Sequence, residues 1–132
     1  MARATRIKSH EDLEAYQLAF LLAMRVFELS KAFPREETYS LTDQIRRASR
    51  SVCANIAEGW QKRLYSAAFV SKLSDAETGA TETQVWAQFA VACKYLPIDA
   101  GDEIRRGYDH VIGKLVKMMT HPEEWALPSG EH

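Results

Sequence analysis

The sequence predicts an all-α fold, specifically an antiparallel up-down-up-down four-helix bundle. Apolar residues recur at helical spacing in four long stretches that together account for nearly the whole chain. The segments between these stretches are short, so neighbouring helices should run antiparallel. No stretch alternates apolar and polar residues in the manner of a strand. These observations favour a helical bundle over a mixed or all-β architecture.

Length and composition are those of one globular domain. With 132 residues, 46% of them apolar and 27% charged, the chain can bury a core without disulfide or metal support. We expect residues 1–122 to form the bundle and residues 123–132, which show no periodicity, to form a loose tail. No apolar run reaches the length of about 20 residues that a membrane span needs, so no membrane partner is expected.

Charge and cysteine content further limit the class of protein and its compartment. The formal net charge of −1 argues against a general nucleic-acid coat protein, because such proteins carry a large basic excess. Cys53 and Cys93 are too few for a disulfide framework or a zinc site, and both fall within helical patterns. A reducing, cytoplasmic compartment is therefore expected.

The first helix is predicted over about residues 10–31. Ser9 and Asp12 form a capping-box-like pair at its start, and the helix stops before Phe33-Pro34, because a residue before proline disfavours helical geometry. A surface helix needs one apolar stripe, but this helix has two, which indicates contact with its own bundle and with something else. The two faces are Leu13, Tyr16, Phe20, Met24 and Phe27, and then Leu18, Leu22, Val26 and Leu29.

The second helix is predicted over about residues 40–61, with Ser40 as N-cap and Asp43 completing a box-like pair. It carries an apolar seam and, beside it, a row of hydrogen-bonding groups. The seam consists of Leu41, Ile45, Ala48, Val52, Ile56 and Trp60, and the polar row consists of Arg47, Ser51, Asn55 and Glu58.

The third and fourth helices are predicted over about residues 66–95 and 99–119, ended by Pro97 and by His121-Pro122. The third has a seam of mostly small residues and a second, bulkier one; the surplus apolar surface predicts an oligomer. The three seams are Phe69, Leu73, Ala76, Ala80, Ala87 and Ala90; Trp86, Phe89, Cys93 and Leu96; and, in the fourth helix, Ile104, Tyr108, Val111, Leu115 and Met118.

Basic residues gather in and just after the second helix. Residues 42–63 carry a local excess of three positive charges. The candidate nucleic-acid-binding residues are Arg46, Arg50, Lys62 and Arg63, which would contact phosphates or stack on RNA bases. For Arg46 and Arg50 a structural role, pairing with acids across the bundle or between subunits, remains equally open. We assign Arg47 to such a structural role because it shares the polar row.

Nothing in the sequence indicates catalysis. The four histidines lack metal-ligand spacing, and neither a Glu-x-x-His motif nor a glycine-rich phosphate loop is present. We therefore predict a non-enzyme with no catalytic residue, no metal site and no cofactor. The polar row is expected to form a hydrogen-bonded network; the alternative is a small ligand pocket around Asn55 and Glu58.

Three segments resemble the signature of the four-helix-bundle family that includes the large-subunit ribosomal RNA intervening-sequence proteins. They are FPREE at 33–37, LTDQIRRA at 41–48 and NIAEG at 55–59, and weaker similarity extends from about Asp12 to about Met119. The resemblance implies a four-helix bundle and a ring-shaped homopentamer, and it supports Glu82 as the partner of Arg47. Other members are similar to accessory proteins of diversity-generating retroelements, which assist a reverse transcriptase.

We therefore expect a non-enzymatic homo-oligomeric adaptor, pentameric as the resemblance implies, that binds RNA or a ribonucleoprotein partner. One alternative is a protein–protein scaffold without nucleic-acid binding, in which the arginines serve the interface. The third is a small-molecule binder that uses the polar region at residues 55–58.

Overall fold

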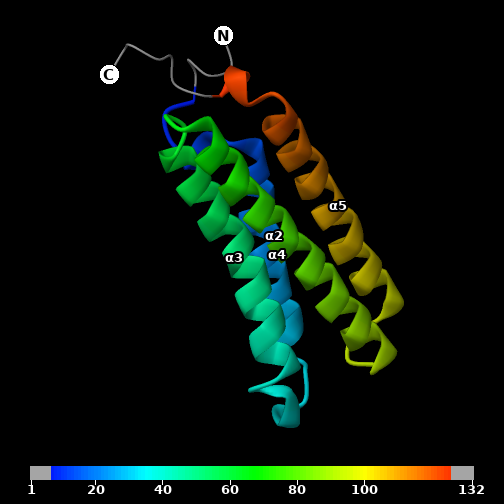
Figure 1. Ribbon diagram of the computed structural model, residues 1–132. Coiled ribbons are helices and arrows are strands. Elements are labelled where there is room, and N and C mark those ends of the chain that lie inside the picture. Colours follow the sequence, from blue (N-terminus) through cyan, green and yellow to red (C-terminus); the bar gives the residue numbers. More distant parts are fainter. Residues whose placement is uncertain (1–6, 126–132) are drawn as a thin grey trace.

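The computed structural model describes residues 7–125, and within this range it confirms the all-α fold. Four long helices follow one another in up-down-up-down order: α2 (Glu14–Ser30), α3 (Leu41–Gln61), α4 (Ser66–Ala92) and α5 (Ile98–Thr120) (Figure 1). Three short 3₁₀ turns, η1 (His10–Asp12), η2 (Arg35–Glu37) and η3 (Pro122–Glu124), accompany them, and residues 7–125 contain no strand.

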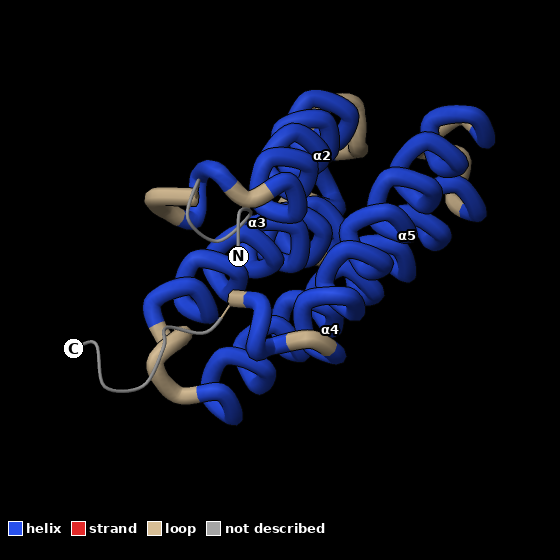
Figure 2. Tube along the Cα trace, turned by 90° about the horizontal axis from the view of Figure 1, so that it is seen from above, coloured by secondary structure: helices blue, strands red, loops and turns tan. Residues whose placement is uncertain are grey.

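Each helix packs on two neighbours, in the cyclic order α2, α3, α4 and α5 (Figure 2). The contact between α3 and α4 is the most extensive. Large side chains from all four helices fill the centre, among them Val26, Ile56, Phe69 and Tyr108. The apolar seams predicted for α3 and α5 are buried throughout, as is the small-residue seam of α4.

The two apolar faces of α2 separate into an inner and an outer one. Leu22 and Val26 are buried in the core, whereas Phe20 and Met24 point outward and are exposed. The second seam of α4 divides in the same way, because Leu96 is buried and Phe89 is exposed. Both helices therefore keep apolar side chains that the bundle itself does not cover.

The helix starts differ in detail from the prediction. The Ser9–Asp12 capping box is present, but it caps η1, and α2 begins only at Glu14 because Leu13 is extended. Ser40 makes no side-chain capping bond. Instead the Glu37 carboxylate accepts a hydrogen bond from the Leu41 N–H at 3.1 Å, so an acid from η2 takes the capping role.

The structure also corrects two predictions, one about the end of α4 and one about the segment after α5. α4 stops at Ala92 rather than near residue 95, because Lys94 adopts φ 66° and the Tyr95 N–H turns back to the Ala90 carbonyl, a left-handed helix cap. The predicted loose tail over 123–132 is wrong at its start, since Trp125 is buried against the bundle. Residues 126–132 lie outside the described range.

Candidate nucleic-acid interface

The four candidate cations lie along α3 and in the turn that follows it. Two of them are held, which means that their side chains bind neighbouring residues, and two are free of such contacts. Arg46 is held against α2. Its Nε donates to Ser30 Oγ at 2.8 Å, and its guanidinium lies 4.9 Å from the centre of the Phe27 ring. Arg46 thus joins α2 to α3, through a hydroxyl and a ring rather than through the acid that the structural alternative expected, and its role in RNA binding stays a prediction.

Arg63 is held in a similar way at the other end of α3. Its guanidinium lies 3.5 Å from the centre of the Trp60 ring, and its Nε donates to the Trp60 carbonyl at 2.7 Å. Burial lowers the pKa of Arg63 from its usual value, but a guanidinium stays protonated at neutral pH. Arg63 thus contributes charge from a fixed position.

Arg50 and Lys62 are the free pair. Both are exposed, and neither forms a hydrogen bond through its side chain or an ion pair within residues 7–125. Their positions are twelve residues apart, which corresponds to about 18 Å along a helix axis. Two available cations at this separation can contact two phosphates of an extended backbone.

The polar row of α3 does not form the predicted network. Arg47 instead pairs with Asp43, one turn earlier, with Nε 3.2 Å from Oδ1. Ser51 Oγ donates to the Ala48 carbonyl and Asn55 Nδ2 to the Ser51 carbonyl, at 2.7 Å and 3.0 Å. Carbonyls three or four residues back are the nearest acceptors for such side chains on a helix, which explains the local pairing.

The predicted pairing of Arg47 with Glu82 is not formed either. Glu82 is exposed on α4 and makes no hydrogen bond or ion pair through its side chain in the described part of the chain. Glu58 contacts α4 through Lys72, with 3.6 Å between Oε2 and Nζ. The hydrogen bonds of the row therefore stay within α3, and one ion pair, Glu58–Lys72, links the row to α4.

Ser51 lies at a close contact between α3 and α4. A Cβ added at Gly79 of α4 would lie 2.5 Å from Ser51 Oγ and 3.3 Å from the Ala48 carbonyl oxygen. The two backbones can approach this closely only because residue 79 has no side chain. This role of Ser51 is steric rather than part of a ligand site.

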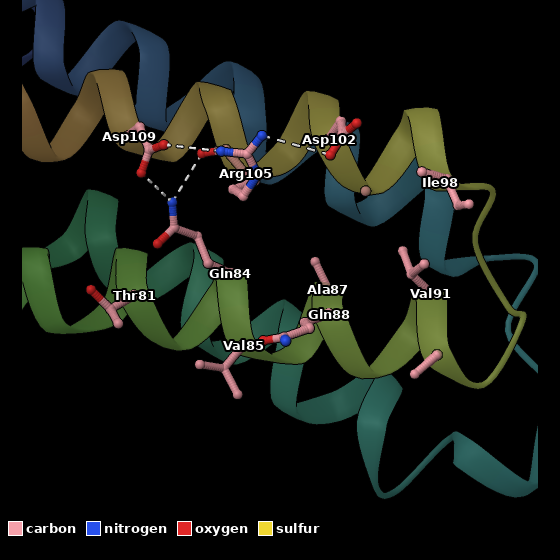
Figure 3. A pocket seen from close by; sticks show the side chains of 12 residues that line it. Thr81, Gln84, Val85, Ala87, Gln88, Val91, Ile98, Asp102, Arg105 and Asp109 are labelled. Atoms are coloured by element: carbon pink, nitrogen blue, oxygen red, sulfur yellow. Dashed lines mark hydrogen bonds and ion pairs between the residues drawn. The ribbon is translucent and has the colours of Figure 1, made fainter.

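A groove lies between α4 and α5, away from the polar row, and has a volume of about 740 Å³. Val85 and Val91 of α4 and Ile98 of α5 line its apolar part (Figure 3). At one end, Gln84 Nε2 donates to Asp109 Oδ1 and to the Arg105 carbonyl, both at 2.9 Å. We refer to this feature as the α4–α5 groove.

Neither the α4–α5 groove nor a smaller one beside Glu82 and Trp86 includes Asn55 or Glu58. Both polar side chains are engaged in the local contacts described above. The structure therefore gives no support to the small-molecule alternative at residues 55–58. Among the residues that the structure describes, no group of histidine, cysteine or acidic side chains is arranged to hold a metal ion.

The sequence reasoning missed several exposed apolar residues. Leu21 fell outside both predicted faces of α2, yet it is exposed beside Phe20 and Met24. Val85 and Ile98 belonged to no predicted seam and are exposed on α4 and α5. The available signal was that each interrupts a polar face of its own helix.

With four antiparallel helices the protein is an all-α four-helix bundle. The model of the family described as 23S rRNA-intervening sequence protein matches residues 11–117, and the chain belongs to that family. The chain is similar to a solved structure from Bacteroides thetaiotaomicron, a protein with unknown function from the S23 ribosomal protein family. The two are 24% identical with a TM-score of 0.73, over 80% of this chain and 95% of that one. No curated protein matches the chain significantly.

The likeness to this solved structure supports the fold, and the family match accounts for the FPREE, LTDQIRRA and NIAEG segments. Within the described range, none of the helices is both long and apolar enough to cross a membrane.

Proposed function

We propose that the protein is a non-enzymatic, cytoplasmic adaptor that binds RNA as a homo-oligomer, with five copies in a ring. The observation that carries the proposal is the free pair of Arg50 on α3 and Lys62 directly after it. Both cations are exposed and have no acidic partner within residues 7–125. Arg106 and Lys117 of α5 are also exposed and unpaired, but their basic neighbours Arg105 and Lys114 are paired with acids. Arg50 and Lys62 instead stand beside two further cations that no acid neutralises, which favours phosphate contacts.

The two held arginines add to the positive potential of this face. Arg46 contacts the Ser30 hydroxyl and the Phe27 ring, and Arg63 contacts the Trp60 ring and carbonyl. All these partners are uncharged, so the contacts fix the two guanidiniums without neutralising them. Together the four residues give a local positive field on a chain whose total charge is −1.

One protomer offers only a few phosphate contacts, and repetition in an oligomer would multiply them. Linked sites bind a long ligand far more tightly than a single site does, because the later contacts become intramolecular. Exposed apolar side chains on α2 and α4 support self-association, and the family resemblance supports a pentamer. The name of the matching family, which refers to 23S rRNA, supports RNA as the ligand.

The test compares RNA binding by the wild-type oligomer and by Arg50→Gln/Lys62→Gln across a salt series. We expect the wild-type affinity to fall steeply with salt. The variant should bind more weakly, with a slope reduced by about one for each phosphate that it no longer neutralises. The matched control is Arg106→Gln/Lys117→Gln, which removes two exposed cations from α5 and should leave binding nearly unchanged.

Equal decreases in affinity for the two double variants would mean that only net charge matters and would contradict an interface on α3. Absence of binding at low salt, with the oligomer intact, would discard RNA as the ligand. The protein–protein scaffold would then be the better explanation, and partners captured from a lysate should persist after nuclease treatment.

A further inference from the structure

The turn between α3 and α4 carries an exposed aromatic ring close to two cations, at one end of the bundle (Figure 1). Tyr65, the last residue before α4, is 64% exposed, and its hydroxyl has no hydrogen-bond partner within residues 7–125. Lys62 and Arg63 lie in the same turn. Residues 59–74 contain no acidic residue, so neighbours in the chain do not neutralise these charges.

Arg63 already stacks on an aromatic ring. Its guanidinium lies over the Trp60 ring, 3.5 Å from the ring centre, and its Nε donates to the Trp60 carbonyl at 2.7 Å. Trp60 is buried, whereas Arg63 keeps part of its surface in solvent. One face of the planar guanidinium is therefore covered by Trp60, and the opposite face is the one that solvent reaches.

Backbone hydrogen bonds fix the turn that carries these groups. The Arg63 N–H donates to the Trp60 carbonyl at 3.4 Å, and the Tyr65 N–H donates to the Lys62 carbonyl at 2.9 Å. Residues that are two positions apart are separated by at most about 7 Å along the backbone. The Tyr65 ring and the Arg63 guanidinium are thus two flat groups held close together, within reach of neighbouring bases of one strand.

We infer that this turn binds unpaired RNA bases, which stack on the Tyr65 ring and on the solvent side of the Arg63 guanidinium while Lys62 contacts phosphate. The inference rests on the proposed function and names its substrate class, single-stranded rather than double-stranded RNA. Bases in a duplex are stacked on each other, whereas unpaired bases can stack on aromatic rings and on guanidinium planes. Every base has a flat face, so the contact needs no particular sequence.

A nucleotide satisfies both kinds of group in this turn, which an apolar protein surface does not. Such a surface would cover Tyr65 but would remove water from Lys62 without supplying a partner for its charge, and burying an unpaired charge is costly. A nucleotide supplies a base for the ring and a phosphate for the cation.

The test compares the wild type with Tyr65→Leu, using fluorescein-labelled oligouridine and an RNA duplex of equal length in a salt series of anisotropy measurements. Tyr65 makes no side-chain capping bond to α4, so the variant should fold. Because leucine has no flat ring, we expect the affinity for oligouridine to fall about 5- to 100-fold and the affinity for the duplex to stay the same. The salt slope should not change, since no phosphate contact is removed.

Three further variants separate stacking from other effects. Tyr65→Phe keeps the ring and should bind oligouridine like the wild type. Arg63→Lys keeps the charge but loses the flat guanidinium, so it should weaken binding of oligouridine at an unchanged salt slope. The matched control, Tyr39→Leu, removes a tyrosine that is 94% exposed at the start of α3, after a turn with one base and two acids, and should bind both RNAs normally.

The outcomes separate this inference from the proposed function. If the wild type binds RNA but does not prefer the single strand, or if Tyr65→Leu binds oligouridine as tightly as the wild type, base stacking at this turn is overturned while RNA binding stands. Equal losses on both RNAs would also overturn it, because they would indicate damage to the oligomer. If the wild type binds neither RNA, both proposals are overturned. Circular dichroism checks folding; should Tyr65→Leu fail to fold, Arg63→Lys decides with the same two RNAs.

Discussion

Gly79 is a residue on which the close contact between α3 and α4 depends. A methyl group there would meet Ser51 Oγ at 2.5 Å and Val52 Cγ2 at 3.2 Å, and the α3 backbone behind them cannot move without disturbing the core. We expect Gly79→Ala to lower the free energy of unfolding by about 1–3 kcal/mol, the usual cost of overpacking. Urea denaturation at fixed protein concentration measures the change.

Gly113 provides the control for this substitution. It lies on the exposed side of α5, where an added Cβ would meet nothing within 4 Å. Gly113→Ala should therefore raise stability by about 0.5–1 kcal/mol, because alanine favours the helix and nothing opposes it. Equal effects of the two substitutions would show that helix propensity, rather than the α3–α4 contact, dominates at residue 79.

Tyr108 carries the only buried side-chain oxygen or nitrogen in the described residues without a hydrogen-bond partner, its Oη. Thr83 is close enough to lower the pKa of Tyr108 slightly, but its hydroxyl donates to the Gly79 carbonyl at 2.8 Å. Burial is the larger influence and raises the pKa of Tyr108. The phenol is thus kept neutral and its oxygen unsatisfied.

We expect Tyr108→Phe to keep the packing and to remove this unsatisfied oxygen. Since a buried polar group without a partner costs about 1–3 kcal/mol, the variant should be at least as stable as the wild type, by up to about 1 kcal/mol. Thermal or urea unfolding decides the sign. A clear loss of stability would show that the hydroxyl is hydrogen-bonded in solution, for example to an internal water.

The interaction partners of polar side chains were the feature that the sequence predicted least well. Helical spacing put Arg47 in a polar row beside the apolar seam, but it could not foresee that Arg46 would bind Ser30 of α2. Such a contact depends on how two helices pack, which periodicity does not encode. Arg47 found Asp43 within its own helix, an i,i+4 pair that the sequence does display.

At the scale of elements, one end of the bundle is held by a contact between the two loops there. Tyr95, after α4, donates its hydroxyl to Glu37 Oε2 of η2 at 2.9 Å, and its ring packs on Phe33 at 5.7 Å. The other oxygen of Glu37 caps α3. The FPREE segment therefore has a structural role, because its phenylalanine and its last glutamate both contact Tyr95.

The Tyr95–Glu37 hydrogen bond makes part of the stability depend on pH. The bond to Glu37 is the main cause that raises the pKa of Tyr95 from 10.0 to about 12 in the folded protein. Because the raised value favours the protonated phenol in the folded state, this contribution is complete below about pH 10 and is lost as the pH rises to about 12.

Tyr95→Phe removes this contribution and leaves the others. We expect the variant to have a lower urea midpoint than the wild type below pH 10, and the difference to vanish toward pH 12. Burial raises the pKa of Cys53 to about 11. Ionisation of this thiol at high pH destabilises the wild type and the variant equally, so it does not change the difference between them. A difference that stays constant across this range would show that ring packing, not the hydrogen bond, is what the substitution changes.

Helix identity was predicted well and helix ends less so, for a physical reason. The seams of α3 and α5 are long and strictly periodic, so their burial follows from sequence alone. The end of α4 depends on Lys94, a non-glycine residue in the left-handed region that sequence signals do not reveal. The start of α3 depends on Glu37 from a neighbouring turn rather than on Ser40.

At the scale of the whole molecule, the sequence indicated surplus apolar surface but not its distribution. The two faces of α2 showed that one must remain outside the bundle, and the structure shows that the outer one carries Phe20 and Met24. The α4–α5 groove was not predicted from the sequence, because a concave surface depends on how two helices pack against each other.

Assembly and RNA binding are expected to be coupled through the number of phosphate contacts in one complex. Leu21→Glu leaves Arg50 and Lys62 in place but puts a charge among the exposed apolar side chains of α2, which we expect to block self-association and to give monomers. On an RNA long enough to span several protomers, we expect this variant to bind at least about 100-fold more weakly than the wild type, with a shallower salt dependence. On an RNA that covers one protomer, the two proteins should differ little.

Tyr39→Glu separates this coupling from the effect of charge. It adds the same negative charge as Leu21→Glu, but at an exposed loop position away from the exposed apolar residues of α2 and α4, so the oligomer and its affinity for long RNA should be retained. Fluorescence anisotropy with the two RNA lengths measures all three proteins under one salt series. If the Leu21→Glu monomer bound long RNA as tightly as the wild type, each protomer would act alone, and repetition of the α3 face would have no part in recognition.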